Sequence, residues 1–359
     1  MGVKKGATVL AFATAAMVAL TASAAARTQT VWAGGPTGFQ NTLHKAYSAE
    51  ALDFFPRTVT VNVGDTISWQ GMSIGFHSID IPAKGGSDLP LILPTGAKVS
   101  GLNDFAGSPF WFNGQPVLGF NPQLGAPLGG KTYNGSSRVD SGLPTGPPTP
   151  YKITFLKPGV YEYFCDVHYD MHGFVVVQPK GKPTPSAAQN AATVAKQTLR
   201  DFKIARALSR TKIHGSRVSL GVAGKDNVEV LAMLPSTLRV KTGTTVTFAM
   251  SRLTGETHTA TFGPAGYLKP LANSFNGPVP SPTALYPSSP PGTPLTLNPT
   301  SHGNGFANTG ALDEDASTPL PPGAKITFTA PGTYHFVCLI HPFMRGTVVV
   351  TGGTPPLTG

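Results

Sequence analysis

The feature that most constrains the fold of this chain of 359 residues is an internal duplication. Residues 152–161 (KITFLKPGVY) match residues 325–334 (KITFTAPGTY), and the later segments 173–177 (GFVVV) and 346–350 (GTVVV) also correspond. A repeat of this kind means that one supersecondary unit is used twice. Because each copy places a Pro-Gly turn between short runs of β-branched and aromatic residues, the pattern predicts antiparallel strands.

Period-2 alternation of apolar residues extends the duplication toward the N-terminal side of each copy. Two short strands around a Gly-containing turn are predicted in both copies by Val59, Val61, Ile67 and Trp69 and by Leu238, Val240, Val246 and Phe248. The 42 glycines and 35 prolines are typical of a turn-rich β protein and argue against a helical bundle. We therefore expect an all-β chain with one domain over residues 28–179 and a second over residues 216–352.

Residues 180–215 differ from both copies and are predicted to form a linker that contains a helix. The linker opens with Pro183 and Pro185, and Ser186 with Gln189 forms a capping box. Apolar residues then recur at helical spacing, which predicts a helix over residues 186–210. Its apolar face is mostly alanine, so packing on a neighbouring sheet is favoured over a membrane-surface helix.

The first 26 residues have the pattern of an export signal, in which Lys4 and Lys5 precede an apolar run and small residues at Ala22, Ala24 and Ala26. After cleavage we expect no integral membrane segment and an extracytoplasmic location, secreted or periplasmic. The formal net charge is +10, but the basic residues are scattered and no aromatic-basic motif accompanies them. Nucleic-acid binding is therefore not expected.

The chemistry is concentrated in a motif that occurs twice, Cys165-x-x-His168-x-x-Met171 and Cys338-x-x-His341-x-x-Met344. Two further histidines, His77 and His258, follow the first strand pair of each copy in corresponding places. Two imidazoles, one thiolate and a weak thioether are the ligand set of a blue-copper electron-transfer centre, whereas zinc does not use the thioether. A disulfide between the two cysteines is the alternative that an oxidising compartment permits.

On these residues, each copy resembles a plastocyanin/azurin-type cupredoxin with the short ligand loop of amicyanin-like members. The likeness covers most of residues 28–179 and 216–352. It implies two tandem Greek-key β-sandwiches and outer-sphere electron transfer through an exposed edge of His168 or His341. It also implies one copper per domain, two per chain, bound by His77, Cys165, His168 and Met171 and by His258, Cys338, His341 and Met344.

The function expected is an electron carrier between a donor and an acceptor redox protein, with a copper-holding protein as the alternative. An oxidoreductase is disfavoured, because laccases and copper nitrite reductases place a histidine beside the blue-copper cysteine. Here Cys165 and Cys338 have no histidine neighbour, and the chain contains no His-x-His pair. Because each predicted ligand set lies within its own copy, we expect the two centres to be independent. The long segments 82–150 and 264–323 could be functional lids, packed irregular loops or disordered segments, among which composition does not choose. Aromatic residues favour a packed covering for the first.

Overall fold

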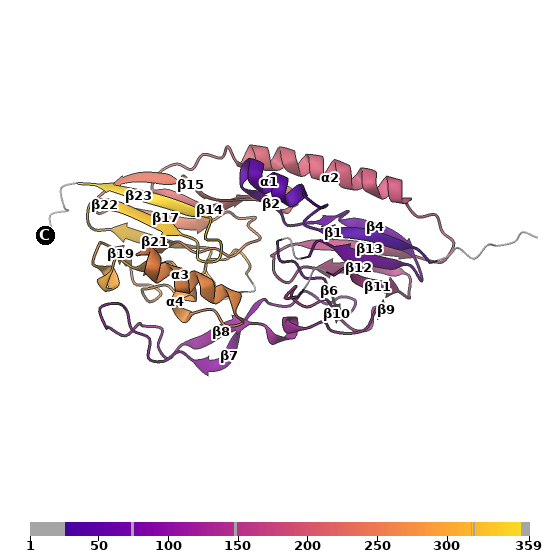
Figure 1. The fold of residues 1–359 in the computed structure, drawn as a ribbon, viewed down its shortest axis with the longest axis horizontal. Helices are drawn as coiled ribbons and strands as arrows, with labels where there is room; N and C mark the ends of the chain where they lie inside the picture. The colour runs from indigo at the N-terminus through magenta and orange to yellow at the C-terminus, as the bar shows by residue number, and fades with distance from the viewer. Residues whose placement is uncertain (1–25, 73–74, 147–148, 317, 319, 353–359) are drawn as a thin grey trace, which may run out of the picture.

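The computed structural model describes residues 26–72, 75–146, 149–316, 318 and 320–352. Two β-sandwich units lie side by side, and helix α2 (Ala187–Leu208) runs along one side of both (Figure 1). The export signal expected at the N-terminus falls almost wholly on residues 1–25, which lie outside the described residues. Within the part of the chain that is described, no helix is long and apolar enough to cross a membrane.

The first unit consists of two five-stranded sheets, β3-β1-β5-β11-β9 and β10-β6-β12-β13-β4. Apolar residues that alternate along the strands of both sheets meet between them, with Trp69, Phe155 and Tyr163 among the fully buried side chains. The strands are β1 (Thr28–Ala33), β3 (Phe54–Phe55), β4 (Thr58–Asn62), β5 (Thr66–Gln70), β6 (Asp80–Ile81), β9 (Thr132–Tyr133), β10 (Val139–Asp140), β11 (Tyr151–Phe155), β12 (Gly159–Phe164) and β13 (His172–Gln178).

The second unit consists of sheets β19-β21-β17-β14-β15-β2 and β16-β23-β22-β18-β20. Phe248, Phe262 and Phe328 fill the space between them. The strands are β14 (Arg217–Ala223), β15 (Val228–Leu234), β16 (Thr237–Lys241), β17 (Thr245–Met250), β18 (Thr261–Phe262), β19 (Leu295–Leu297), β20 (Ala307–Asn308), β21 (Gly323–Phe328), β22 (Gly332–Val337) and β23 (Arg345–Thr351).

Apart from the additional edge strand β2 (Ala49–Ala51) of the second unit, the two units have the same strand order. In the first unit the chain crosses from one sheet to the other between β4 and β5, and in the second unit it crosses between β16 and β17. In both units it crosses again just before the hairpin that carries the motif cysteine. That hairpin is β12–β13 in the first unit and β22–β23 in the second, antiparallel in each. The predicted fold class, all-β with two tandem Greek-key β-sandwiches and a linker helix, is confirmed.

Helix α2 begins where the capping box predicts it. The Ser186 side chain accepts from the backbone of Gln189, and the Gln189 side chain accepts from the backbone of Ser186. The helix packs on protein, as the alanine-rich face indicates. Its Phe202 ring meets Phe39 of helix α1 (Phe39–Tyr47) edge to face, and Gln197 donates to the backbone oxygen of Phe54.

Strand β2 (Ala49–Ala51) links the two units, because it lies within the first sequence copy but pairs with β15 of the second unit. It forms the edge of the second unit's six-stranded sheet. The domain boundaries expected at residues 28–179, 180–215 and 216–352 therefore stay predictions. One strand from the range 28–179, β2, belongs to a sheet of the second unit.

The first long segment also reaches the second unit. It contains the hairpin β7 (Ile92–Lys98) and β8 (Pro116–Phe120), which lies below helices α3 (Ala265–Asn273) and α4 (Pro282–Leu285) in Figure 1. The indole of Trp111 donates to the backbone oxygen of Pro287 over 2.8 Å. The ring of Phe112, which is fully buried, stacks on Tyr286. The expected packed covering is confirmed, and the segment covers the second unit.

Four short 3-10 helices complete the elements of the described residues: Pro122–Gly125, Lys225–Asn227, Ser274–Asn276 and Ser301–Gly303.

A buried carboxylate on α2 makes the stability of this assembly depend on pH. Asp201 is fully buried, and its Oδ2 atom has no hydrogen-bond partner among the described residues, although Arg200 contacts Oδ1 at 3.1 Å. Burial raises the pKa of Asp201 to about 7, against the opposing charge of Arg200. The folded state therefore keeps a proton that the unfolded state loses near pH 4.

We predict that stability falls between about pH 4 and pH 7, by up to about 1.4 kcal/mol per pH unit from this group, and levels off above. Asp201→Asn has no titratable group at this position. The free energy of unfolding of the variant, relative to that of the wild type, should therefore increase as the pH rises over this range. Urea unfolding of both proteins at pH 4.5, 6 and 8 measures the difference. A difference that does not change with pH would show that Asp201 titrates normally.

Candidate metal centres

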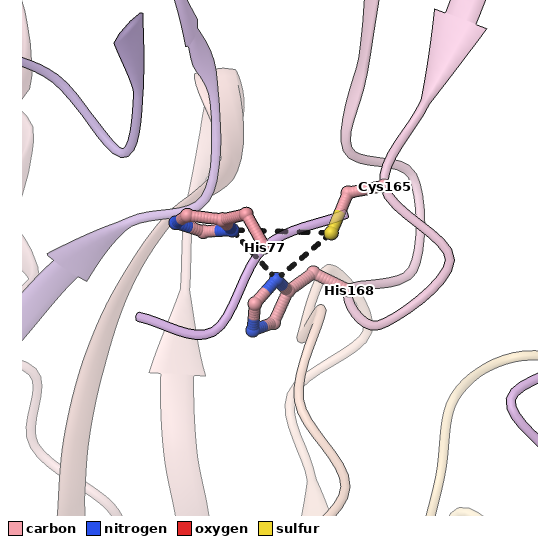
Figure 2. A group of neighbouring side chains, drawn as sticks. All are labelled: His77, Cys165 and His168. Atoms are coloured by element: carbon pink, nitrogen blue, oxygen red, sulfur yellow. Dashed lines mark hydrogen bonds between the residues drawn. The ribbon is translucent and has the colours of Figure 1, made fainter. Parts of the chain in front are cut away.

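The first centre forms where the hairpin β12–β13 meets the segment between β5 and β6. Cys165 directly follows β12, His168 lies in the loop to β13, and His77 precedes β6. The Nδ1 atoms of the two histidines are 3.0 Å apart, and Cys165 Sγ lies 3.4 Å from Nδ1 of His168 and 3.9 Å from Nδ1 of His77 (Figure 2). Each of the three residues is at most 3% exposed. The structure thus brings together three of the four side chains that the sequence predicts as ligands.

The second centre repeats this arrangement with residues of the second unit. The Nδ1 atoms of His258 and His341 are 3.0 Å apart, and Cys338 Sγ lies 3.7 Å and 3.9 Å from them respectively. His258 and Cys338 are fully buried, whereas the His341 side chain is 17% exposed. Both cysteines are free, so the disulfide alternative is not what the structure shows.

The spacing of the motif is explained by a tight loop that is the same in both units. The backbone nitrogen of Cys165 donates to the oxygen of Met171 over 2.9 Å, and the nitrogen of Met171 donates back to His168 over 3.1 Å. Cys338, Met344 and His341 make the equivalent bonds over 3.0 and 2.8 Å. These bonds close the loop and direct each methionine side chain into the core beside its cysteine, where Met171 and Met344 are each 1% exposed. Their role as axial ligands stays a prediction.

Each cysteine sulfur has a backbone hydrogen-bond donor, and the surroundings of Cys338 favour its thiolate. The backbone nitrogens of Ser78 and Thr259 each donate to the cysteine sulfur of their unit over 3.4 Å. Burial alone would raise the pKa of Cys338, but hydrogen bonds and charge from His258 and His341 lower it well below its usual value. Hydrogen bonding to the charged form is what stabilises a buried thiolate.

The donor sets fit a trigonal metal site. Two nitrogens and one sulfur held at about 2.0 to 2.3 Å from a central ion lie about 3.5 to 3.7 Å from one another. The observed separations, 3.0 to 3.9 Å, bracket these values in both units. Because both imidazoles direct Nδ1 inward, their Nε2 atoms point away from the centre and are free to contact other groups.

The Nε2 atoms of His77 and His258, the two histidines that lie before the motif in sequence, have different surroundings in the two units. His258 Nε2 lies 3.3 Å from Oε1 of Glu229, a fully buried residue of β15. Burial opposes protonation, but hydrogen bonds from Cys338 and Glu229 raise the pKa of His258 to about 10. His77 Nε2 has no hydrogen-bond partner within the described part of the chain. It packs closely against Gly34 and Gly75, where an added Cβ would come within 2.8 and 2.9 Å of it.

The Nε2 atoms of His168 and His341, the two motif histidines, contact the same carboxylate. Nε2 of His168 lies 3.2 Å from Oε1 of Glu256, and Nε2 of His341 lies 3.5 Å from Oε2 of the same residue. Burial would raise the pKa of Glu256, but the charges of His168 and His341 lower it to about 2. Sequence reasoning missed Glu256. Its position two residues before His258 was the available signal, but it could not reveal a contact with the other copy.

The contact with Glu256 corrects one expectation. The resemblance implies an exposed edge on His168 or His341, but His168 is 3% exposed because the second unit covers it. The backbone nitrogen of Tyr169, next in the chain, donates to the oxygen of Gly255 over 3.0 Å. Only the His341 ring retains access to solvent. Beside it lies Phe343, which is 51% exposed.

A third group of potential ligands is special to the first unit. Oxygen atoms of Asp80, Asp140 and Asp166 lie within 4.8 Å of one another, all buried, and Arg138 pairs with Asp80. Burial and the charge of Asp166 raise the pKa of Asp80 to about 9. The strand register places Thr261 and Asn308 of the second unit where Asp80 and Asp140 stand in the first. The first centre therefore borders an acidic cluster and the second a neutral network.

Comparison with known proteins adds partial likenesses only. No family model matches the chain, and no curated protein matches it. Among solved structures, a reduced amicyanin variant is similar at 21% identity over 39% of this chain and 86% of its own, with a TM-score of 0.22. Plastocyanin from Dryopteris crassirhizoma is similar at 24% over 38% and 99%, with a TM-score of 0.21, and auracyanin B at 21% over 38% and 86%, with 0.22. Likenesses with TM-scores this low carry no conclusion about function.

Gly221 is the position where packing around the second centre is tightest. Its φ is +75°, and an added Cβ would lie 2.4 Å from Oε1 of Glu229 and 3.2 Å from Nε2 of His258. We predict that Gly221→Ala displaces this pair and weakens zinc(II) or copper(I) binding at the second centre by about 10- to 100-fold, as loss of a ligand's outer support does elsewhere. Chelator competition on the Cys165→Ser background, in which only the second centre is complete, measures the affinity.

The matched control is Gly215→Ala. Gly215 has nearly the same φ, +73°, but nothing within 4 Å of an added Cβ, so it carries the backbone strain alone. Equal affinities in the two variants would contradict the packing argument.

Proposed function

We propose that this protein is an electron carrier with two blue-copper centres, one in each of two tandem cupredoxin domains. The observation that carries the proposal is the repeated convergence of two Nδ1 atoms and one Sγ atom, buried and 3.0 to 3.9 Å apart, on a loop that also holds a buried methionine. In the first domain the ligands would be His77, Cys165, His168 and Met171. In the second they would be His258, Cys338, His341 and Met344.

The protein's part in such a function is to hold the ligands still and exclude water. A bound copper ion would supply reversible one-electron chemistry. The buried loops, the backbone donors to each sulfur and the outer contacts of His168, His258 and His341 fix the ligands in one geometry. Ligands that do not rearrange between oxidation states keep the cost of electron transfer low.

Two alternatives to an electron carrier, an oxidoreductase and a copper-holding protein, differ from it in features that can be checked. An oxidoreductase of the laccase or nitrite reductase type would need a histidine beside the cysteine, but Phe164 and Asp166 flank Cys165, and Val337 and Leu339 flank Cys338. A copper-holding protein would keep its metal in one oxidation state. Reversible reduction and reoxidation by a small redox protein favours the carrier.

We further propose that donor and acceptor are redox proteins met outside the cytoplasm, since the first 26 residues have the pattern of an export signal. The partly exposed ring of His341 and the exposed ring of Phe343 make the second domain the face for such a partner. The first centre lacks an equivalent opening at His168, which is 3% exposed.

We predict that the purified protein is intensely blue and holds two copper ions per chain. Cys165→Ser and Cys338→Ser should each remove about half of the blue absorption, because the thiolate is the ligand that gives a blue-copper centre its character. Visible and electron paramagnetic resonance spectra with copper analysis measure this. A colourless wild-type protein would refute the proposal. Loss of all blue absorption in either single variant would show that the two ligand sets are misassigned.

A further inference from the structure

The two candidate centres meet at an interface built from both units. The ligand loop of the first unit docks on the turn that precedes His258 in the second. The Tyr169 nitrogen donates to the oxygen of Gly255 over 3.0 Å, and the Asn227 side chain donates to the oxygen of Asp170 over 2.6 Å. Glu256 therefore stands where the first unit's ligand loop, the second unit's ligand loop and the turn come together.

The position of Glu256 is set by its neighbours and leaves little freedom. Glu229 contacts His258 through Oε1 and accepts from the nitrogen of Gly255 through Oε2 over 3.1 Å, which ties the turn to the second centre. At Gly255 an added Cβ would lie 3.0 Å from both the Leu52 side chain and the oxygen of Tyr169. The two units approach so closely here that a larger side chain at this position would have to displace one of these neighbours. The Glu256 carboxylate is 8% exposed and faces His168 and His341 from between them.

We propose that Glu256 joins the two centres into one electron-exchange unit by holding the outer nitrogens of His168 and His341 on its two carboxylate oxygens. This inference rests on the proposed function. With copper held by the two ligand sets, the exchange would oxidise the ion at one centre by one electron and reduce the ion at the other by the same electron. No covalent bond would be made or broken, and no proton would leave the protein.

The geometry provides a nearly continuous path for that electron. The path runs through Nδ1, Cε1 and Nε2 of His168, then Oε1, Cδ and Oε2 of Glu256, then Nε2, Cε1 and Nδ1 of His341. Its noncovalent gaps are the contacts of 3.2 and 3.5 Å at either end of the carboxylate. The path therefore consists of bonded atoms and two ion-pair contacts, and a contiguous network of this kind can carry coupling between two sites.

A carboxylate suits this position because two N–H donors need two acceptors. When Nδ1 of each histidine is turned inward to a metal ion, Nε2 carries the proton and donates outward. Glutamate offers an oxygen to each ring, whereas glutamine offers one oxygen and a competing N–H group. Glu256→Gln therefore keeps the size of the side chain and breaks one of the two contacts. The matched variant is Glu229→Gln, which alters a buried carboxylate that contacts His258 and the Gly255 nitrogen but makes no ion pair with His168 or His341.

The first experiment needs no redox activity. In zinc(II)-loaded wild-type protein, proton NMR should show slowly exchanging Nε2–H signals from both His168 and His341, and Glu256→Gln should lose or strongly shift at least one of them. Glu229→Gln should leave both signals in place and change the signal of His258. The absence of both signals in the wild type would overturn the proposal even if no variant folded, as would signals unchanged in Glu256→Gln.

The second experiment measures the step itself. Copper-loaded protein is reduced with less than one electron per chain by a radiolytic pulse, and the two centres are followed as they exchange the electron. The rate of this exchange should be independent of protein concentration, because both centres lie in one chain. Glu256→Gln should slow it by about tenfold or more. An unchanged rate in a variant that keeps both blue centres would overturn the proposal. A wild type without blue centres would instead refute the proposed function, while the zinc-loaded protein would still test the bridge.

Discussion

The relation between the two candidate centres depends on one buried carboxylate held between two imidazoles from different units. A charge removed from water is costly unless it is paired and hydrogen-bonded. Glu256 is 8% exposed, and its partners are His168 from the first unit and His341 from the second. Neither unit alone supplies both partners, so the pairing requires the two sandwiches to hold a fixed relation.

Three connections between the units provide that relation. Strand β2 leaves the first sequence copy to complete a sheet of the second, the aromatic residues of the β7–β8 hairpin cover helices α3 and α4, and helix α2 packs along both units. Each connection buries apolar surface, so ordinary packing contributes to the fixed relation that positions Glu256.

The same interface makes two similar centres unequal. His168 is closed off by the turn at Gly255, and the first centre borders the acidic cluster of Asp80, Asp140 and Asp166. The second centre keeps a partly open edge at His341 beside Phe343. One candidate centre is therefore enclosed, and the other is partly open to solvent. Each candidate His/Cys/His group lies within one unit, whereas the surroundings are shared, and the independence of the two centres stays a prediction.

The sequence alone was sufficient for several features that depend on local pattern. Period-2 alternation and the Pro-Gly turns predicted strands, and the Ser186–Gln189 box predicted the start of α2. Tertiary structure alone decided that β2 pairs with β15, that His168 is buried, and that Glu256 faces both centres. The reason is physical: periodicity and capping act between residues a few positions apart, whereas the partners of a buried charge are chosen by how two folded units pack, which repeats in a sequence do not record.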